Sequence, residues 1–495
     1  MTALPLCVAA AAFIVAVGLP SGDPDMWWHL ASGRWMIDHG ELLKVDIFSS
    51  TATGRPYAVG EWLGQIALAA VHGAAGWTGV AVLRAALVAV AAFSLTRVAL
   101  RAAAASPVDV SPMWRGAIAI SLVAVALALS TIAWTDRPQL VTIALFPVLL
   151  DLLFAARAGG RRALFVVPPL LFAWSDLHAG YALGLVVVSL FAADAALARR
   201  DAGAFALAAT VSFAVVVANP GAIGVLPATA HVATAPRIIV EESPPDVLTA
   251  AGAVFGLFAV AVLAALLLRG GPLLAVLLLV PLLWLALSAQ RHMVFFVFAA
   301  VPFLTEASTS RWDRARGRRE GVTPTRSSQR PHERGVPDPS ELRLIEAGAP
   351  REGARARRPL APGVAALLWI AAFASIPLTA PTAPDESLYP RGALPALRAS
   401  SGVLIHEYDW GGYLIWNAPE RPVFVDGRLR PFVPDILDDH LRATLVRPGW
   451  MRVLDEHGVR QALLSPERPL AAALRDEGWT VLAEGERFVL LERPR

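Results

Sequence analysis

The sequence predicts an α-helical polytopic membrane protein with a small α/β domain at its C-terminal end. Of its 495 residues, 56% are hydrophobic and only 17% are charged, and the mean hydropathy is +0.55. Soluble proteins carry roughly a quarter charged residues. Apolar stretches long enough to span a bilayer as helices recur from the N-terminus to about residue 380. Beyond that point short strand and helix patterns alternate, which is typical of an α/β domain.

About eleven transmembrane helices are expected from the apolar segments. These segments are 3–20, 62–74 with 77–100, 115–134, 138–156, 162–175, 180–197, 203–218, 249–268, 272–288, 291–306 and 362–380. The short segment 62–74 is interpreted as a half-helix or an interfacial helix. The expected regions are a helical membrane domain (1–309) with an outer loop (21–61), a disordered basic linker (310–361), a last transmembrane helix (362–380) and an extracytoplasmic α/β domain (381–495).

Basic residues mark one side of the membrane. Arginines cluster in alternate loops and in the linker, as Arg97, Arg101, Arg115, Arg157, Arg161, Arg162, Arg199, Arg200, Arg269 and Arg311. The positive-inside rule assigns that side to the cytoplasm. The N-terminus is then cytoplasmic and the C-terminal domain extracytoplasmic, in agreement with an odd number of crossings. We expect a multi-pass protein of the bacterial cytoplasmic membrane.

Charge and cysteine content exclude other classes. The pI near 9.4 does not indicate a nucleic-acid partner, because the arginines lie in short loops and the linker. The single cysteine, Cys7, excludes an internal disulfide and a cysteine-based metal site.

Residues 21–40, directly after the first apolar segment, contain an unusual density of charge. Asp23 is the expected N-cap of a helix that has Pro24 at its first position. This amphipathic helix would lie in the membrane interface, with Trp28 and Trp35 on one face. One cap suffices for a helix, so Asp25, one turn further on, needs another explanation.

Each outer turn carries an acid, an arginine or a histidine. The residues are Asp23, Asp25, His29 and Arg34 in the first loop, then Asp136 and Arg137, Asp176 and His178, Glu241 and Glu242, and Arg291 and His292. Charges at membrane depth are costly unless they are paired or hydrated, so they often mark function. Each one alone is equally well explained as a solvated loop end or a local cap. Together they predict one polar site at the outer mouth of the bundle.

The residue types suggest chemistry on a phosphate. The carboxylates Asp23, Asp25, Asp176 and Glu241 suit a divalent cation such as Mg²⁺ or Mn²⁺. Arg137, Arg291 and His292 suit a phosphate. A lipid-linked phosphate donor would use both, and Asp25 is the first choice for a base acting on an acceptor. Asp23 would divide its role between capping and metal binding, and His29, one turn beyond Asp25, would contact phosphate or metal.

The segment after residue 380 predicts the small domain in detail. Strands are expected at 402–410, 421–429 and 460–465, helices at 434–446, 450–458 and 469–479, and a hairpin at 480–493 that turns at Gly485. Asp426 and Gly427 are interpreted as a turn after a strand. Trp410 and Tyr413 are either aromatic residues that dock this domain on the membrane domain or contacts to an acceptor.

Two segments carry a resemblance to a known class. GDPDMWWHLASGRWMIDHG (22–40) with DIFSSTATGRP (46–56) is similar to the first outer loop of oligosaccharyltransferase catalytic subunits. These belong to the GT-C class of membrane glycosyltransferases, which use polyprenyl-phosphate-linked sugars and carry an acidic motif in that loop. EYDWGGYLIWNAPERPVFVDGRLR (407–430) resembles their Trp-Trp-Asp-Tyr-Gly region, with a different residue order. The resemblance implies that Tyr408, Asp409 and Trp410 help to bind the acceptor.

The chain also resembles a group of uncharacterised bacterial membrane proteins. The shared motifs are Asp-Pro-Asp-x-Trp-Trp-His, Arg-Pro-Gln, a Trp-x-x-x-His-x-Gly turn, Asn-Pro, Arg-His and Trp-Gly-Gly-Tyr-Leu, found here at 23–29, 137–139, 174–180, 219–220, 291–292 and 410–414. This resemblance covers the whole chain except the linker.

The function expected from these features is transfer of a sugar from a polyprenyl-phosphate-linked donor to an acceptor of unknown type in the cell envelope, outside the cytoplasmic membrane. One alternative is a non-catalytic envelope assembly or scaffold protein with the same fold. A second is a transporter or flippase of a lipid-linked solute, which would need polar residues deep in the spans. The spans are rich in Ala, Leu and Val, and their polar residues are expected at the outer ends.

Overall fold

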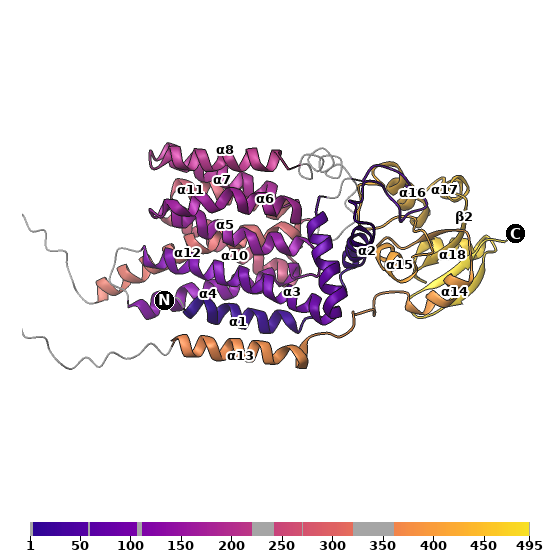
Figure 1. Ribbon diagram of the computed structural model, residues 1–495, viewed down its shortest axis with the longest axis horizontal. Coiled ribbons are helices and arrows are strands. Elements are labelled where there is room, and N and C mark those ends of the chain that lie inside the picture. The colour runs from indigo at the N-terminus through magenta and orange to yellow at the C-terminus, as the bar shows by residue number, and fades with distance from the viewer. Residues whose placement is uncertain are drawn as a thin grey trace, which may run out of the picture.

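The protein consists of a helical bundle and a C-terminal domain that covers one end of it (Figure 1). The structure is a computed structural model that describes residues 3–57, 60–105, 111–219, 242–269, 271–319 and 361–494. Helix α2 (Pro24–His39) lies between the bundle and the C-terminal domain (Figure 1). The predicted fold class, a helical membrane protein with a small C-terminal α/β domain, is confirmed.

The segments predicted to span the membrane are all helical. Among the described residues, six helices are long and apolar enough to cross a membrane. They are α3 (Trp62–Ala104), α4 (Pro112–Ser130), α5 (Gln139–Arg157), α10 (Ala250–Arg269), α12 (Met293–Arg319) and α13 (Ala361–Thr379). Shorter helices are α1 (Ala3–Val17), α6 (Val167–Leu177), α7 (Tyr181–Leu197), α8 (Ala202–Val217) and α11 (Leu273–Ser288). The number of crossings stays a prediction.

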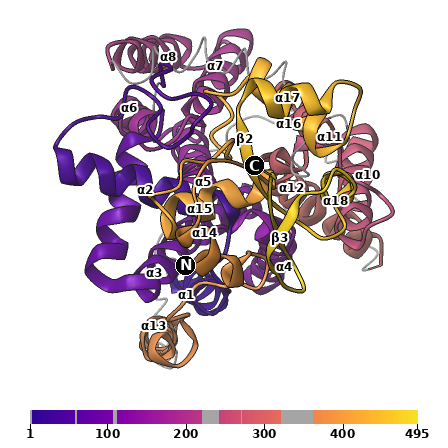
Figure 2. The same cartoon turned by 90° about the vertical axis from the view of Figure 1, so that its right-hand side faces the viewer.

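Helix α12 lies at the centre of the bundle and α13 at its edge. Each residue from Met293 to Val301 is at most 6% exposed, which is the pattern of a helix surrounded by other helices. Helix α13 packs against α1 on one side of the bundle (Figures 1 and 2). Phe13 and Trp369 join these two helices, with ring centroids 5.8 Å apart.

Helix α2 forms as its sequence predicts. Asp23 is the N-cap, and its Oδ1 accepts a hydrogen bond from the backbone N–H of Asp25 at 2.9 Å. Pro24 occupies the first turn, and Gly40 ends the helix in the left-handed conformation at φ 66°. Such an ending favours glycine, because a Cβ is disfavoured at positive φ.

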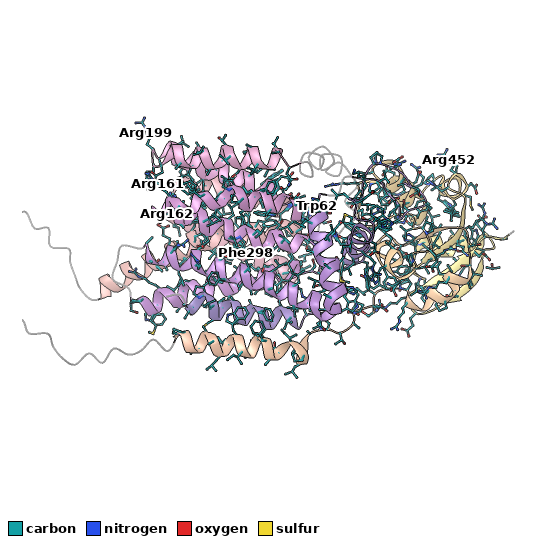
Figure 3. All side chains as sticks on the ribbon, in the orientation of Figure 1. Trp62, Arg161, Arg162, Arg199, Phe298 and Arg452 are labelled. Atoms are coloured by element: carbon teal, nitrogen blue, oxygen red, sulfur yellow. The ribbon has the colours of Figure 1, made fainter. Side chains whose placement is uncertain are left out.

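Helix α3 has a kink at Gly76, where φ is 59° and ψ is −153°. The kink separates the segments predicted at 62–74 and 77–100. The first part begins at Trp62 and crosses the end of the bundle beside α2 (Figures 1 and 3). This course agrees with the interpretation of 62–74 as an interfacial half-helix.

Charged residues mark both ends of the bundle, and some lie inside it. Arg161, Arg162 and Arg199 lie at the end opposite the C-terminal domain (Figure 3), as the one-sided distribution of arginines predicts. The orientation in the membrane stays a prediction. Arg84, in the middle of α3, is only 2% exposed, which corrects the expectation that polar residues occur only at the outer ends of the spans.

The C-terminal domain contains a mixed four-stranded sheet in the order β1-β2-β4-β3. Its strands are β1 (Val403–His406), β2 (Val459–Leu464), β3 (Thr480–Glu484) and β4 (Val489–Glu492), and its helices include α14 (Leu394–Ala399), α15 (Gly411–Asn417), α16 (Asp435–Thr444), α17 (Trp450–Glu456) and α18 (Pro469–Asp476). Strand β1 is parallel to β2, and the other neighbours are antiparallel. The predicted helices and the hairpin with its turn at Gly485 are therefore found.

The predicted strand at 421–429 is wrong. Val423, Phe424 and Val425 are each fully buried, so they do not show the alternating burial of a strand with one solvent-facing side. Instead this segment pairs with the first outer loop, because Val423 donates its backbone N–H to the carbonyl oxygen of Phe48 at 3.0 Å. The expected linker also begins later than predicted, since residues 310–319 continue α12. Its remainder, 320–360, lies outside the described residues.

Candidate functional site

Two glycines bring the C-terminal domain into direct contact with α2. A Cβ on Gly412 would lie 2.6 Å from the carbonyl oxygen of Pro24, and a Cβ on Gly427 would collide with Oδ1 of Asp25. Gly412 therefore lets the two backbones approach closely, and Gly427 leaves room for the side chain of Asp25.

Aromatic side chains complete this contact. Tyr413 is fully buried, stacks on Tyr389 with centroids 4.7 Å apart and meets Trp27 edge-on at 5.2 Å. Trp410 donates its indole N–H to the carbonyl oxygen of Leu388 at 3.1 Å. The contacts of Trp410 and Tyr413 support the docking interpretation of these two residues.

A dry ion cluster joins the first outer loop to the C-terminal domain. We refer to Asp46, Asp426 and Arg428 as the Arg428 cluster. One terminal nitrogen of Arg428 lies 2.5 Å from Asp46 and 2.6 Å from Asp426, and all three side chains are fully inaccessible to solvent. The rings of Phe48, Tyr57 and Phe432 surround the guanidinium. Asp426 thus has a charged partner as well as the turn position that its sequence predicts.

The two predicted catalytic acids share one arginine. We refer to Asp23, Asp25 and Arg137 as the Arg137 cluster. Arg137 donates to Oδ2 of Asp25 at 2.5 Å, and its Nε lies 3.5 Å from Oδ2 of Asp23. Oδ1 of Asp25 accepts from the indole of Trp28 at 3.0 Å. Both oxygens of Asp25 are therefore engaged, although 22% of its side chain is exposed to solvent.

His29 and His178 lie beside the Arg137 cluster as neutral rings. Gln65 donates to Nδ1 of His29 at 3.2 Å, and Nδ1 of His178 accepts from the backbone of Gly180 at 3.0 Å and from Thr142 at 2.8 Å. Burial and the charge of Arg137 hold the pKa of His29 well below its ordinary value. Each ring therefore carries its proton on Nε2.

Three arginines from different parts of the chain face His178. Burial and the positive charges of Arg137, Arg291 and Arg430 lower the pKa of His178 to about 3. Arg291 donates to Glu242 at 2.8 Å, and His292 points back at the carbonyl oxygen of Leu285 at 3.3 Å. The sequence analysis did not identify Arg430, whose only signal is its position three residues after the Asp-Gly turn.

Asp176 is held by the first turn of α3. Its Oδ1 accepts from the indole of Trp62 at 3.0 Å and from the side chain of Asn219 at 2.7 Å. Gly64, in the same turn, packs against Pro138 and the carbonyl of Leu177. The outer turns therefore meet at one end of the bundle, as predicted.

Three predicted residues behave differently. Arg34 is exposed and lies over the ring of Trp416 at 4.4 Å, outside both ion clusters. Tyr408 is half-buried, and burial together with the negative charges of Asp25 and Asp426 raises its pKa. Asp409 is exposed to solvent. An acceptor-binding role for Tyr408 and Asp409 stays a prediction.

The predicted metal ligands do not form an assembled site. Among the residues that the structure describes, no three His, Cys, Asp or Glu side chains are grouped to hold a metal ion. Asp23 and Asp25 are bound by Arg137, and Asp176 accepts two hydrogen bonds. Glu241 lies outside the described residues. As placed, the carboxylates do not fit a metal, so we derive no step through one.

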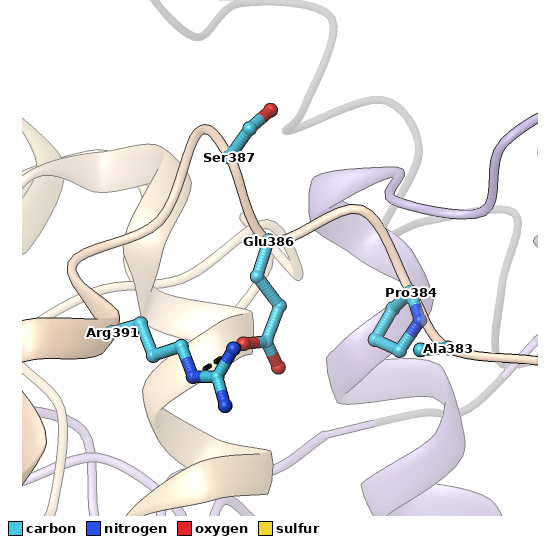
Figure 4. Close-up of a pocket in the computed structure, with 5 residues that line it drawn as sticks. All are labelled: Ala383, Pro384, Glu386, Ser387 and Arg391. Atoms are coloured by element: carbon cyan, nitrogen blue, oxygen red, sulfur yellow. Dashed lines mark ion pairs between the residues drawn. The ribbon is translucent and has the colours of Figure 1, made fainter.

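A surface recess of about 400 Å³ lies on the connection from α13 to the C-terminal domain, lined by Ala383, Pro384, Glu386, Ser387 and Arg391 (Figure 4). Arg391 pairs with Glu386 at 3.4 Å. None of these residues belongs to either ion cluster, so the recess contributes no group to the site.

The fold and the site define a class: a polytopic membrane protein in which an outer-loop helix and a soluble domain enclose polar turns at one end of the bundle. No protein-family model and no curated protein matches the chain. Solved structures of membrane glycosyltransferases do match it.

The archaeal oligosaccharyltransferase AglB from Archaeoglobus fulgidus, in complex with an inhibitory peptide and a dolichol-phosphate, has a TM-score of 0.55 and 12% identity, over 94% of this chain and 69% of that chain. The apo form of the Archaeoglobus fulgidus enzyme gives 0.54 and 11% over the same shares. ArnT from Cupriavidus metallidurans bound to undecaprenyl phosphate gives 0.48 and 16%, over 99% of each chain. The likeness to the archaeal enzyme shows that this chain has the GT-C fold, as its first outer loop predicts.

Proposed function

We propose that this protein is a membrane glycosyltransferase that transfers a sugar from a polyprenyl-phosphate-linked donor to an acceptor at the outer face of the bacterial cytoplasmic membrane. One observation carries the proposal. On a GT-C fold, the acid pair Asp23 and Asp25 is bound to Arg137, which faces His178 together with Arg291 and Arg430. Arginines that converge beneath a soluble domain at one bundle end suit a lipid-borne phosphate.

The arginines supply the stabilisation that the leaving phosphate needs. When the bond between sugar and phosphate breaks, negative charge develops on the phosphate oxygens. Guanidinium groups held in place by Asp25 and Glu242 stabilise this charge without having to reorganise. The archaeal structure with the same fold holds a dolichol-phosphate, which supports a polyprenyl phosphate as the ligand.

A divalent cation, Mg²⁺ or Mn²⁺, stays a prediction, because the carboxylates as placed do not fit a metal. The requirement is tested by chelation with EDTA and re-addition of each ion, and a loss of sugar transfer that re-addition restores would show it.

The test is transfer of labelled sugar from a lipid-linked donor by the protein in proteoliposomes. We expect Asp25→Asn and Asp23→Asn each to lower the rate by about 10–100-fold, because Arg137 loses the partners that position it. Arg34→Gln is the matched control, since Arg34 lies on the same helix but outside the cluster, and it should leave the rate unchanged. Full activity in both aspartate variants would refute the assigned roles.

The described acids of the predicted outer-turn site are all occupied by hydrogen bonds or ion pairs, and this favours a second candidate function, that of a non-catalytic envelope assembly protein. Asp23, Asp25, Asp176 and Glu242 all accept hydrogen bonds or form ion pairs, as they would if they only fastened the C-terminal domain to the bundle. In that case the wild type transfers no sugar from any lipid-linked donor, and Asp25→Asn changes only the thermal stability.

A further inference from the structure

Glu61 stands out among the described acids at the outer end of the bundle, because it is half-buried and no neighbouring side chain engages its carboxylate. Asp23, Asp25, Asp176 and Glu242 have the partners described above, and Asp136 is paired with Arg84 at 2.8 Å. Glu61, by contrast, accepts no side-chain hydrogen bond and forms no ion pair within 4.0 Å among the described residues. Asp409 has no such partner either, but its side chain is exposed to solvent, whereas Glu61 is half-buried.

Glu61 also lies where the outer turns meet. It directly precedes α3 and is the N-cap residue by position, yet its side chain makes no cap hydrogen bond. The turn that follows contacts Asp176 through Trp62, His29 through Gln65, and Pro138 through Gly64. The backbone of Glu61 is thus fixed directly beside residues that contact the site, while its carboxylate makes no cap hydrogen bond.

We propose that Glu61 is the base that accepts the acceptor's proton during sugar transfer, and that Asp25 instead holds Arg137 in place. This inference rests on the proposed glycosyltransferase activity. The acceptor's O–H or N–H proton passes to the Glu61 carboxylate as the acceptor atom bonds to the anomeric carbon of the sugar. The bond from that carbon to the phosphate oxygen breaks, and its electron pair stays on the phosphate.

The surroundings of Glu61 suit this role. Burial raises its pKa, and the charge of Arg430 opposes that shift. A carboxylate with a raised pKa is a stronger base. Asp25, in contrast, would first have to leave both Arg137 and Trp28.

The experiment compares kcat and KM of Glu61→Gln, Glu61→Asp and wild type in the transfer assay. Glu61→Gln should lower kcat by about 100-fold or more with KM for the donor unchanged. Asp25→Asn should lower kcat and also raise that KM, because a displaced Arg137 stabilises the leaving phosphate less and binds the donor less tightly. Glu41→Gln is the control, since Glu41 is an exposed acid of the same outer loop, and it should behave as wild type.

A pH profile separates a base from a merely structural residue. Among the described residues, Tyr57 and Arg430 interact electrostatically with Glu61, and Asp176 is hydrogen-bonded by the next residue, Trp62. The wild-type kcat should fall on acidification as Glu61 is protonated, Glu61→Asp should shift this acidic limb, and the residual rate of Glu61→Gln should lack it. Thermal unfolding of each variant checks its folding.

The outcomes are distinguishable. An active wild type with Glu61→Gln within twofold of it, or with an unchanged acidic limb in Glu61→Asp, overturns this inference and leaves the proposed function standing. A wild type that transfers no sugar overturns both.

Discussion

The Arg428 cluster and the Arg137 cluster have the same composition and opposite surroundings. Each contains one arginine between two aspartates, and each lies where the C-terminal domain meets the N-terminal part of the chain. The side chains of the Arg428 cluster are fully inaccessible to solvent and surrounded by aromatic rings. Those of the Arg137 cluster are 10–22% exposed and face two neutral histidines.

The comparison indicates that solvent accessibility decides whether an arginine with two aspartates holds the fold together or binds a ligand. A fully buried ion cluster binds no ligand, and its effect is to fix the geometry of the chain around it. A cluster that keeps some exposure can exchange its partners for a ligand. The Arg428 cluster is therefore assigned to holding the domain, and the Arg137 cluster to the chemistry.

Removing the buried arginine should give the largest effect. Arg428→Met leaves the carboxylates of Asp46 and Asp426 buried without their ion-pair partner, which costs about 3–5 kcal/mol of stability. Thermal unfolding of the detergent-solubilised protein measures it. Arg452→Ala is the control, because Arg452 is 69% exposed on the surface of the same domain (Figure 3). A loss below about 1 kcal/mol for Arg428→Met would remove the distinction between the clusters.

Removing the accessible arginine should affect activity more than stability. We expect Arg137→Gln to lower sugar transfer by about 100-fold, since a guanidinium at the developing phosphate charge is lost. Its unfolding temperature should fall less than that of Arg428→Met. If Arg137→Gln were as destabilising as Arg428→Met, both clusters would be structural.

Gly427 directly precedes Arg428 in the chain and contacts Asp25 of the other cluster. Its substitution therefore tests whether activity can be lowered without a loss of stability. A Cβ at this position meets the carboxylate of Asp25, while the neighbouring Arg428 keeps its partners. Gly427→Ala should lower transfer about tenfold, equivalent to ~1.4 kcal/mol, with little change in stability. Gly256→Ala in α10, where a Cβ meets nothing within 4 Å, is the control. Equal transfer rates for Gly427→Ala and Gly256→Ala would contradict the close approach of Gly427 to Asp25.

The exposed pair of Arg55 and Asp435 should give the smallest effect. Two hydrogen bonds of 3.0 and 2.8 Å join these side chains across the same interface, but 41% and 58% of them are exposed. Arg55→Ala should therefore cost less than about 1 kcal/mol.

The same pair predicts a pH dependence with a definite sign. The hydrogen bonds from Arg55 lower the pKa of Asp435 to about 2. A carboxylate with a depressed pKa in the folded protein contributes stability above its unfolded pKa of about 3.9 and loses it as the pH falls through the folded value. The difference in unfolding temperature between wild type and Arg55→Ala should thus shrink between about pH 4 and 2. A difference in unfolding temperature that stays constant over this pH range would contradict a contribution of the Arg55–Asp435 pair to stability.

Local signals in the sequence were sufficient to predict the helices and the end of the bundle at which the polar turns lie. The cap at Asp23, the proline after it and Gly40 define α2, and alternate loops of opposite character bring Arg137, His178 and Arg291 to one end of the bundle. These features depend on residues close together in the chain, or on the bilayer, which sorts whole loops by side.

Pairings between distant residues were not predictable in this way. Arg84 binds Asp136 and the carbonyl oxygens of Ala16 and Pro20, although it lies within an apolar span and has no local partner. Asp46 pairs with Arg428, 382 positions further on, and nothing near either residue indicates it. The wrong strand at 421–429 has the same cause, since a distant loop supplies the hydrogen bonds that a strand neighbour would have supplied.

The direct contact between Gly427 and Asp25 has a consequence for biosynthesis. The site combines residues from the first outer loop with residues beyond 400, which leave the ribosome after every helix of the bundle. A chain that stops before this segment can insert its helices but lacks Arg428 and Arg430. The polar site can therefore form only after the segment beyond residue 400 has been synthesised and has packed against α2.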